Sequence, residues 1–138
     1  MPRRRAALVA LAVLAPVPVI AAPAPAGKVY ACPDRPDAGG AGWWSGRRPG
    51  GDPGSSARGP ASGVEVVAGR RGAEGGAFPP ILKPDNPDGS WSLAGETGGL
   101  LLVCRFGTAG VYAATAIPDG VTACRLHRPA GRTGLLCR

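Results

Sequence analysis

Residues 104–125, CRFGTAGVYAATAIPDGVTACR, carry two of the chain's four cysteines, twenty positions apart, with two turn-forming stretches between them. The first stretch is GTAG at 107–110 and the second is PDG at 118–120. Such residues favour turns because glycine reaches positive φ, proline presets φ and aspartate hydrogen-bonds its own backbone. The runs between the turns are apolar or β-branched, so the segment predicts consecutive antiparallel strands joined by short turns.

The turn positions set the strand register. With residues 107–110 as the first turn, Cys104 lies opposite Ala113. With residues 118–120 as the turn of a second hairpin, Ala114 lies opposite Cys124. Because side chains alternate between the two faces of a strand, Cys104 and Cys124 would then point to opposite faces of the sheet. We therefore expect no disulfide between these two cysteines.

A third hairpin supplies a partner for Cys124. With residues 129–132 as its turn, Cys124 lies directly opposite Cys137, where Cβ atoms lie ~4.5–5.5 Å apart and can approach disulfide distance. Cys104 is then left for Cys32. The assignment depends on the turn positions, because a shift of one residue moves a cysteine to the other face. A redox pair and a metal site are the alternatives to two structural disulfides.

The remaining text predicts an all-β fold. Short apolar or β-branched runs bounded by Gly, Pro or Asp recur from residue 64 to residue 138, and no run outside the first residues has the length and 3.6-residue period of a helix. We expect a small antiparallel meander or sandwich-like domain of six or seven short strands at 64–138, stapled by disulfides. Residues 27–63 are rich in Gly, Pro and Ser and predict a flexible arm. In that arm we expect one ring of Trp43-Trp44 to dock on the core rather than form a ligand platform.

Residues 1–26 have the layout of a secretory signal peptide. Three arginines at positions 3–5 precede an apolar run that Pro16 and Pro18 break well short of the ~20 residues needed to span a membrane. Small residues follow, and we expect cleavage after Ala26. Lipidation at Cys32 is the weaker alternative, because bulky Tyr30 precedes it. The mature protein is therefore expected in the periplasm, without a stable membrane anchor.

Charge and compartment limit the partners. The full chain has 16 basic and 9 acidic side chains, and three of the basic ones lie in residues 1–26, so the mature chain keeps 13 against 9, a net charge of +4. Such an excess can favour an anionic polymer or an acidic protein. Basic pairs near Trp43-Trp44 could contact nucleic acid, but an exported protein has little nucleic acid to meet. We expect an envelope polymer or a periplasmic protein as partner, and no nucleic acid.

Motifs for catalysis, metal or cofactor binding are weak. No two cysteines are closer than thirteen positions, whereas thioredoxin-like sites use C-x-x-C. The single histidine, His127, has no Cys or His neighbour for zinc and stands beside Arg125 and Arg128, without a carboxylate to orient it as a general base. Asp85 and Asp88 could act as paired acids on a sugar bond, although Asp-Asn-Pro and Asp-Gly are also ordinary turn sequences. We expect no catalytic, metal or cofactor residues.

Several landmarks follow one another in a fixed order along the chain. They are Cys32 soon after the signal, Leu82-Lys83-Pro84-Asp85, Trp91-Ser92-Leu93, Cys104-Arg105-Phe106, Ile117-Pro118-Asp119-Gly120 with Cys124, and Cys137-Arg138. This order resembles a family of small proteobacterial periplasmic proteins, in which C-R-Y usually stands at residues 104–106. The likeness covers about residues 64–138 plus Cys32. The Gly-rich stretch 39–63 departs from it, as does Val67-Ala68-Gly69, where the family usually has F-D-G. The resemblance implies an exported single-domain protein and carries no catalytic residue.

Together these observations predict a non-enzymatic binding or structural protein of the cell envelope, stapled by Cys32, Cys104, Cys124 and Cys137. A cell-wall glycan hydrolase that uses Asp85 and Asp88 is one alternative. An inhibitor of a periplasmic enzyme is another, because a stapled scaffold suits that role.

Intact mass and non-reducing peptide mapping of the protein purified from the periplasm will test processing and pairing together. We expect residues 27–138 less four hydrogen atoms, one for each of the four cysteines. Peptides should join Cys32 to Cys104 and Cys124 to Cys137. An unprocessed chain would contradict the export prediction, and free thiols or a Cys104–Cys124 peptide would contradict the register.

Overall fold

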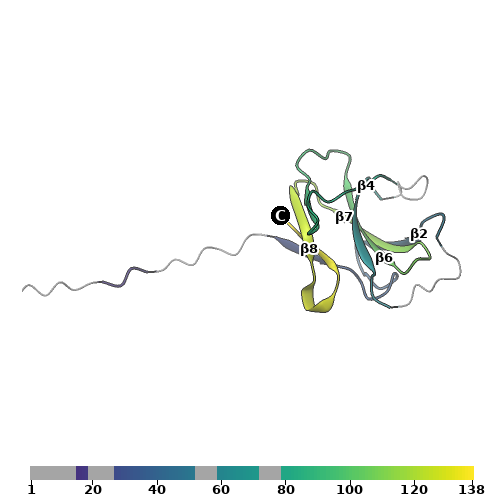
Figure 1. Ribbon diagram of the computed structural model, residues 1–138, viewed down its shortest axis with the longest axis horizontal. Coiled ribbons are helices and arrows are strands. Elements are labelled where there is room, and N and C mark those ends of the chain that lie inside the picture. Colours follow the sequence, from purple (N-terminus) through teal and green to yellow (C-terminus); the bar gives the residue numbers. More distant parts are fainter. Residues whose placement is uncertain (1–14, 19–26, 52–58, 72–78) are drawn as a thin grey trace, which may run out of the picture.

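The computed structural model describes residues 15–18, 27–51, 59–71 and 79–138. In these residues nine strands form two antiparallel sheets, which confirms the all-β class (Figure 1). Seven of them, β3 to β9, lie in the domain expected at 64–138, in agreement with the six or seven strands expected there. None of their helices is long and apolar enough to cross a membrane. Residues 1–14 and 19–26 of the expected signal peptide lie outside the described residues.

Sheet A has four strands in the order β1-β9-β8-β5, and sheet B has five in the order β2-β7-β6-β3-β4. The strands of sheet A are β1 (Lys28–Ala31), β5 (Ser90–Ser92), β8 (Ala123–His127) and β9 (Gly134–Cys137). Those of sheet B are β2 (Trp43–Arg47), β3 (Gly63–Ala68), β4 (Ile81–Leu82), β6 (Leu100–Phe106) and β7 (Val111–Ile117). A short 3-10 turn, η2 (Pro129–Gly131), joins β8 to β9.

The two sheets face each other across one apolar core, so the domain is a sandwich. Sheet A contributes Tyr30, Trp91, Cys124, Leu135 and Cys137, and sheet B contributes Val66, Leu102, Cys104, Phe106, Ala113 and Ile117. All of these side chains are buried. Alternate residues of each strand enter the core because side chains point to opposite faces with a period of two. The other half of each strand therefore lies on an outer face.

Strands β6 and β7 form the hairpin expected from residues 107–110. Cys104 lies opposite Ala113, and Phe106 lies opposite Val111, as the turn position predicts. Gly107 and Gly110 both have positive φ, 63° and 79°, which is the conformation that glycine adopts without steric cost. The register of this hairpin is thus confirmed.

The second expected hairpin is wrong. Residues 118–120 do form a turn, but the chain crosses there from sheet B to sheet A, so Ala114 lies opposite Trp44 rather than Cys124. Strand β8 pairs instead with β5 and β9. Cys104 and Cys124 are unpaired with each other, as expected, but the reason is that they belong to different sheets. Turn chemistry predicts a change of direction and does not say which strand becomes the next neighbour.

Part of the expected flexible arm is folded. Strands β1 and β2 lie within residues 27–63 and pair with β9 and β7, so the boundary expected at residue 64 corrects to the start of β1. Residues 52–58 of the arm lie outside the described residues. The glycine and serine residues of β2 indicate a loop. In the structure, Gly46 lies beneath the ring of Tyr112, which occupies the space that a side chain would take. Packing to the neighbouring strand overrides the low β-propensity of glycine here.

Trp43 and Trp44 pack on opposite faces of sheet B. Trp43 contacts the core between the sheets, and Trp44 contacts a second cluster on the outer face that includes Val103 and Tyr112. The guanidinium carbon of Arg71 lies 4.9 Å from the centre of the Trp44 ring, within the range of a cation–π contact. The docking expected for one ring therefore holds for both.

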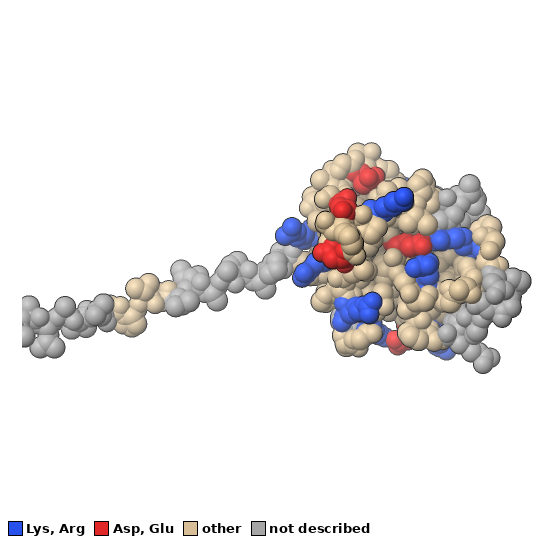
Figure 2. Space-filling model, viewed as in Figure 1, with Lys and Arg blue, Asp and Glu red and all other residues tan. Residues whose placement is uncertain are grey.

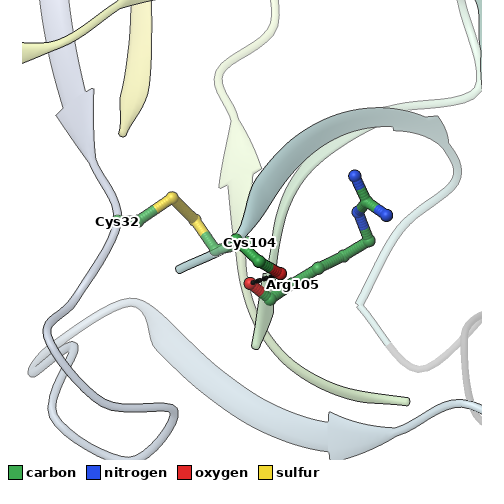
Figure 3. Close-up of a disulfide and its surroundings, with 4 residues drawn as sticks. Cys32, Cys104 and Arg105 are labelled. Carbon is green, nitrogen blue, oxygen red and sulfur yellow. Dashed lines mark hydrogen bonds between the residues drawn. A yellow bond between two sulfur atoms is a disulfide. The ribbon is translucent and has the colours of Figure 1, made fainter. Parts of the chain in front are cut away.

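The two disulfides join the cysteines as expected, Cys32 to Cys104 and Cys124 to Cys137, and no described cysteine is free. Cys124–Cys137 staples β8 to β9 within sheet A, whereas Cys32–Cys104 crosses from the end of β1 to the middle of β6. Figure 3 shows Cys104 pointing toward Cys32 and the side chain of the next residue, Arg105, pointing away to the other face of β6. One disulfide thus stiffens a sheet and the other links the two sheets.

The two disulfides should differ in their contribution to stability. Closing loops of 72 and 13 residues in the unfolded chain is worth about 4 and about 3 kcal/mol in the chain-entropy model. We expect the Cys32→Ala, Cys104→Ala variant to lose more free energy of unfolding than the Cys124→Ala, Cys137→Ala variant. Urea denaturation of both variants beside the wild type measures this difference. A larger loss in the Cys124→Ala, Cys137→Ala variant would contradict it.

Candidate functional site

The outer face of sheet A carries two rows of side chains that run across its strands. The first row follows the paired residues Val29, Leu136, Arg125 and Ser90. The second continues the same register through Gly27, Arg138, Ala123 and Ser92, with the amide of Arg138 donating to the carbonyl of Ala123 at 2.9 Å. Apart from the leucine, valine and two arginines, these residues are small. Most side chains on this face are therefore short, and the long side chains of Arg125 and Arg138 project beyond them.

A groove of about 630 Å³ lies on this face and is the largest of the hollows described in the structure. Its floor is formed by the small residues of the two rows, and the segment at Asp85 and Asn86 borders it beside β5. A volume of this size falls within the range of ligand pockets in proteins. We call this hollow the sheet A groove.

Arg125 and Arg138 give the groove a positive character. Both side chains are exposed, and no hydrogen bond, ion pair or ring contact within the described residues involves either guanidinium group. The only acidic side chain that lines the groove is Asp85. Figure 2 shows basic side chains, with acidic ones beside them, at the end of the domain near which Figure 1 marks the C-terminal end of the chain.

Asp85 already serves the fold. Its Oδ2 accepts the backbone amide of Ser92 at 2.5 Å, and its own amide donates to the carbonyl of Ser90 at 2.7 Å. Asp88 accepts the hydroxyl of Ser90 at 3.2 Å and is not among the groove residues. Both carboxylates thus hold the turn that carries β5, which is the turn role that the Asp-Asn-Pro and Asp-Gly sequences indicated. These contacts also occupy the outer edge of β5.

The other residues considered from the sequence do not gather into a site. His127 lies at the end of β8 opposite Gly134. In the described segments, no three His, Cys, Asp or Glu side chains converge in a way that could hold a metal ion. The four cysteines are covalently paired in two disulfides.

A second charged cluster lies on the outer face of sheet B. Glu65 on β3 bonds Arg48 at 2.5 Å and Arg105 on β6 at 3.2 Å, and its side chain is 13% exposed. A hollow of about 230 Å³ lies beside the two arginines. Here each guanidinium group is bonded to the shared carboxylate, so this cluster ties β3, β6 and the end of β2 together and offers less free charge than the sheet A groove.

Sequence reasoning did not identify the groove. In the sequence, Arg125 drew attention only as a neighbour of His127, and Arg138 only as the last residue of a motif. The available signal was the alternation along 123–127 and 134–138, which places Arg125 on the face opposite Cys124. Together with the third hairpin, this alternation aligns Arg125 with Leu136. The hairpin does not indicate that β1 and β5 lie on either side of this pair.

The comparisons with known proteins identify no relative. No protein-family model matches the chain, and neither a curated protein nor a solved structure matches it. The resemblance to small proteobacterial periplasmic proteins therefore stays a prediction, and function has to be argued from the groove.

Replacing the two carboxylates separately should distinguish their roles in the turn. Asp85→Ala removes the acceptor of a backbone amide and should lower the free energy of unfolding by about 1 kcal/mol. Asp88→Ala removes only an exposed contact with a hydroxyl and should cost less. Urea denaturation of the two matched variants gives the comparison. Equal stability of the two variants would mean that the Asp85 contact does not hold β5.

Proposed function

We propose that the protein is an exported, non-enzymatic binding protein of the bacterial cell envelope and that it binds its partner in the sheet A groove. The observation that carries the proposal is that Arg125 and Arg138 line the largest described groove and that neither guanidinium group has a partner among the described residues. Arginine guanidinium groups bind carboxylates and phosphates through paired hydrogen bonds. The groove thus offers binding groups for an anion.

Several other arginines in the described residues have acidic partners. Arg48 and Arg105 share Glu65, and Arg132 bonds Asp34 at 2.6 Å. Among the described residues neither Arg125 nor Arg138 has such a partner, and unlike the exposed Arg128 both of them line the groove. A partner from outside the chain would complete them.

The disulfides support the expected location. Two disulfides are compatible with an oxidising compartment outside the inner membrane. A small domain stapled in this way keeps a fixed binding face without a large core. The signal-peptide pattern and this stability together favour a periplasmic role.

Retention of envelope components tests the proposal. Immobilised wild-type protein is incubated at low salt with periplasmic extract and, separately, with purified envelope polymers. We expect retention of a component that Arg125→Glu abolishes, because the variant reverses the charge of a residue that lines the groove. Arg128→Glu is the matched control, since Arg128 is exposed, lies outside the groove and makes no described ion pair. No retention by the wild type, or equal retention by Arg125→Glu, would count against the proposal.

A further inference from the structure

The placement of the two groove arginines indicates the spacing of the charges they bind. Arg125 lies opposite Leu136 on β9, and Arg138 follows two residues later on the same face. The two arginines are therefore diagonal neighbours across β8 and β9, a relation in which Cα atoms lie ~7–8 Å apart. An anion that lies between the two arginines or above them can therefore be reached by both guanidinium groups.

An extended peptide has a matching repeat. Its side chains on one face recur every second residue, about 6.6 Å apart at a rise of about 3.3 Å per residue. Two acidic side chains at alternate positions could therefore each reach one arginine, and the long arginine stems absorb the small difference in spacing. Adjacent acidic residues would point to opposite faces of such a peptide and could not both reach the groove.

The apolar part of the face also suits a peptide. Leu136 is half-buried beside Arg125, and Val29, its neighbour on β1, is 43% exposed. An apolar side chain of a ligand could cover these two residues while its acidic side chains bind the arginines. A sugar chain would more often need an aromatic surface, but Trp91, the only aromatic residue at the groove, is 5% exposed and donates its indole N–H to the carbonyl of Leu82 at 3.0 Å.

The ligand would lie on the face of the sheet rather than add a strand beside β5. The carbonyl of Ser90 and the amide of Ser92, which point outward from this edge, already bond to Asp85. Side-chain charge rather than backbone pairing therefore provides recognition here. Gly27 lies at the end of the Arg138 row, so the expected cleavage after Ala26 would add an α-ammonium group at that end of the groove.

From this geometry we infer that the occupant of the sheet A groove is an extended acidic segment of a partner protein, with carboxylates at alternate positions and an apolar residue beside them. The inference rests on the proposed binding function and names its ligand class. It requires that Arg125 and Arg138 act together, whereas the neighbouring Arg128 does not take part.

Fluorescence anisotropy with two labelled peptides tests the spacing. Both are eight residues long and have the same composition, two Asp, one Leu and five Ser, but the aspartates are at alternate positions in one and adjacent in the other. We expect the purified exported protein to bind the alternating peptide about tenfold more tightly, because only this peptide bonds both arginines. Equal affinity for the two peptides would overturn the inference.

Variants separate the groove from general charge attraction. Arg125→Gln and Arg138→Gln should each lower the affinity for the alternating peptide about tenfold. Each variant should then bind this peptide no more tightly than the peptide with adjacent aspartates. Arg128→Gln, which removes the same charge outside the groove, should keep that advantage. Equal effects of all three variants would overturn the inference. Circular dichroism confirms that each variant is folded.

The outcome is distinguishable from failure of the proposed function. If Arg125→Glu abolishes retention of an envelope component but the two peptides bind equally, the groove binds an anion of another class and only the peptide inference fails. Tighter binding of poly-phosphate or of an acidic polysaccharide than of the alternating peptide would likewise assign the groove to a polymer. If nothing is retained and neither peptide binds, both proposals fail.

Discussion

The covalent link between Cys32 and Cys104 is the constraint on which the rest of the structure depends. It joins the end of β1 in sheet A to the middle of β6 in sheet B, across a core whose largest fully buried side chains are one phenylalanine and a few leucines and valines. Such a core contributes little free energy on its own. The disulfide reduces the conformational freedom of the unfolded chain, and it fixes which face of β6 is turned toward sheet A. Because side chains alternate along a strand, fixing one set of residues in the core places the other set on the outer face.

This arrangement gives sheet A its outer face. The sheet is small, with strands of three to five residues, and its two middle strands are bonded through Cys124 and Cys137. Both sulfurs are on the core side, so the outer face keeps only small residues and the side chains that rise between them. A site on short, stapled strands positions its charged groups more precisely than a site on loops. Arg125 and Arg138 are therefore held on a rigid platform, at a spacing that the register dictates.

Local sequence predicted the hairpins well and their assembly poorly. Residues 107–110 and 129–132 each join neighbouring strands, and the disulfide pairing follows from the second of these registers. Residues 118–120 have equally strong turn chemistry but connect different sheets. The edge of β7 that a β7–β8 hairpin would have used is occupied by β2, whose glycine and serine residues indicated a loop. Strand β7 is buried on both faces at its centre, but burial of its faces does not determine which strands pair with its two edges.

The sequence by itself determined the all-β class, the hairpins that turn at residues 107–110 and 129–132, the pairing of the four cysteines and the turn role of Asp85 and Asp88. These features depend on contacts between residues close in the chain, on period-two alternation, or on elimination among four cysteines. Only the tertiary structure decided that β8 belongs to sheet A, that β2 completes sheet B, and that Arg125 and Arg138 share a groove with Gly27. Those contacts join residues far apart in the chain, and they form because the apolar faces of two sheets are buried together, a requirement that no short stretch of sequence expresses.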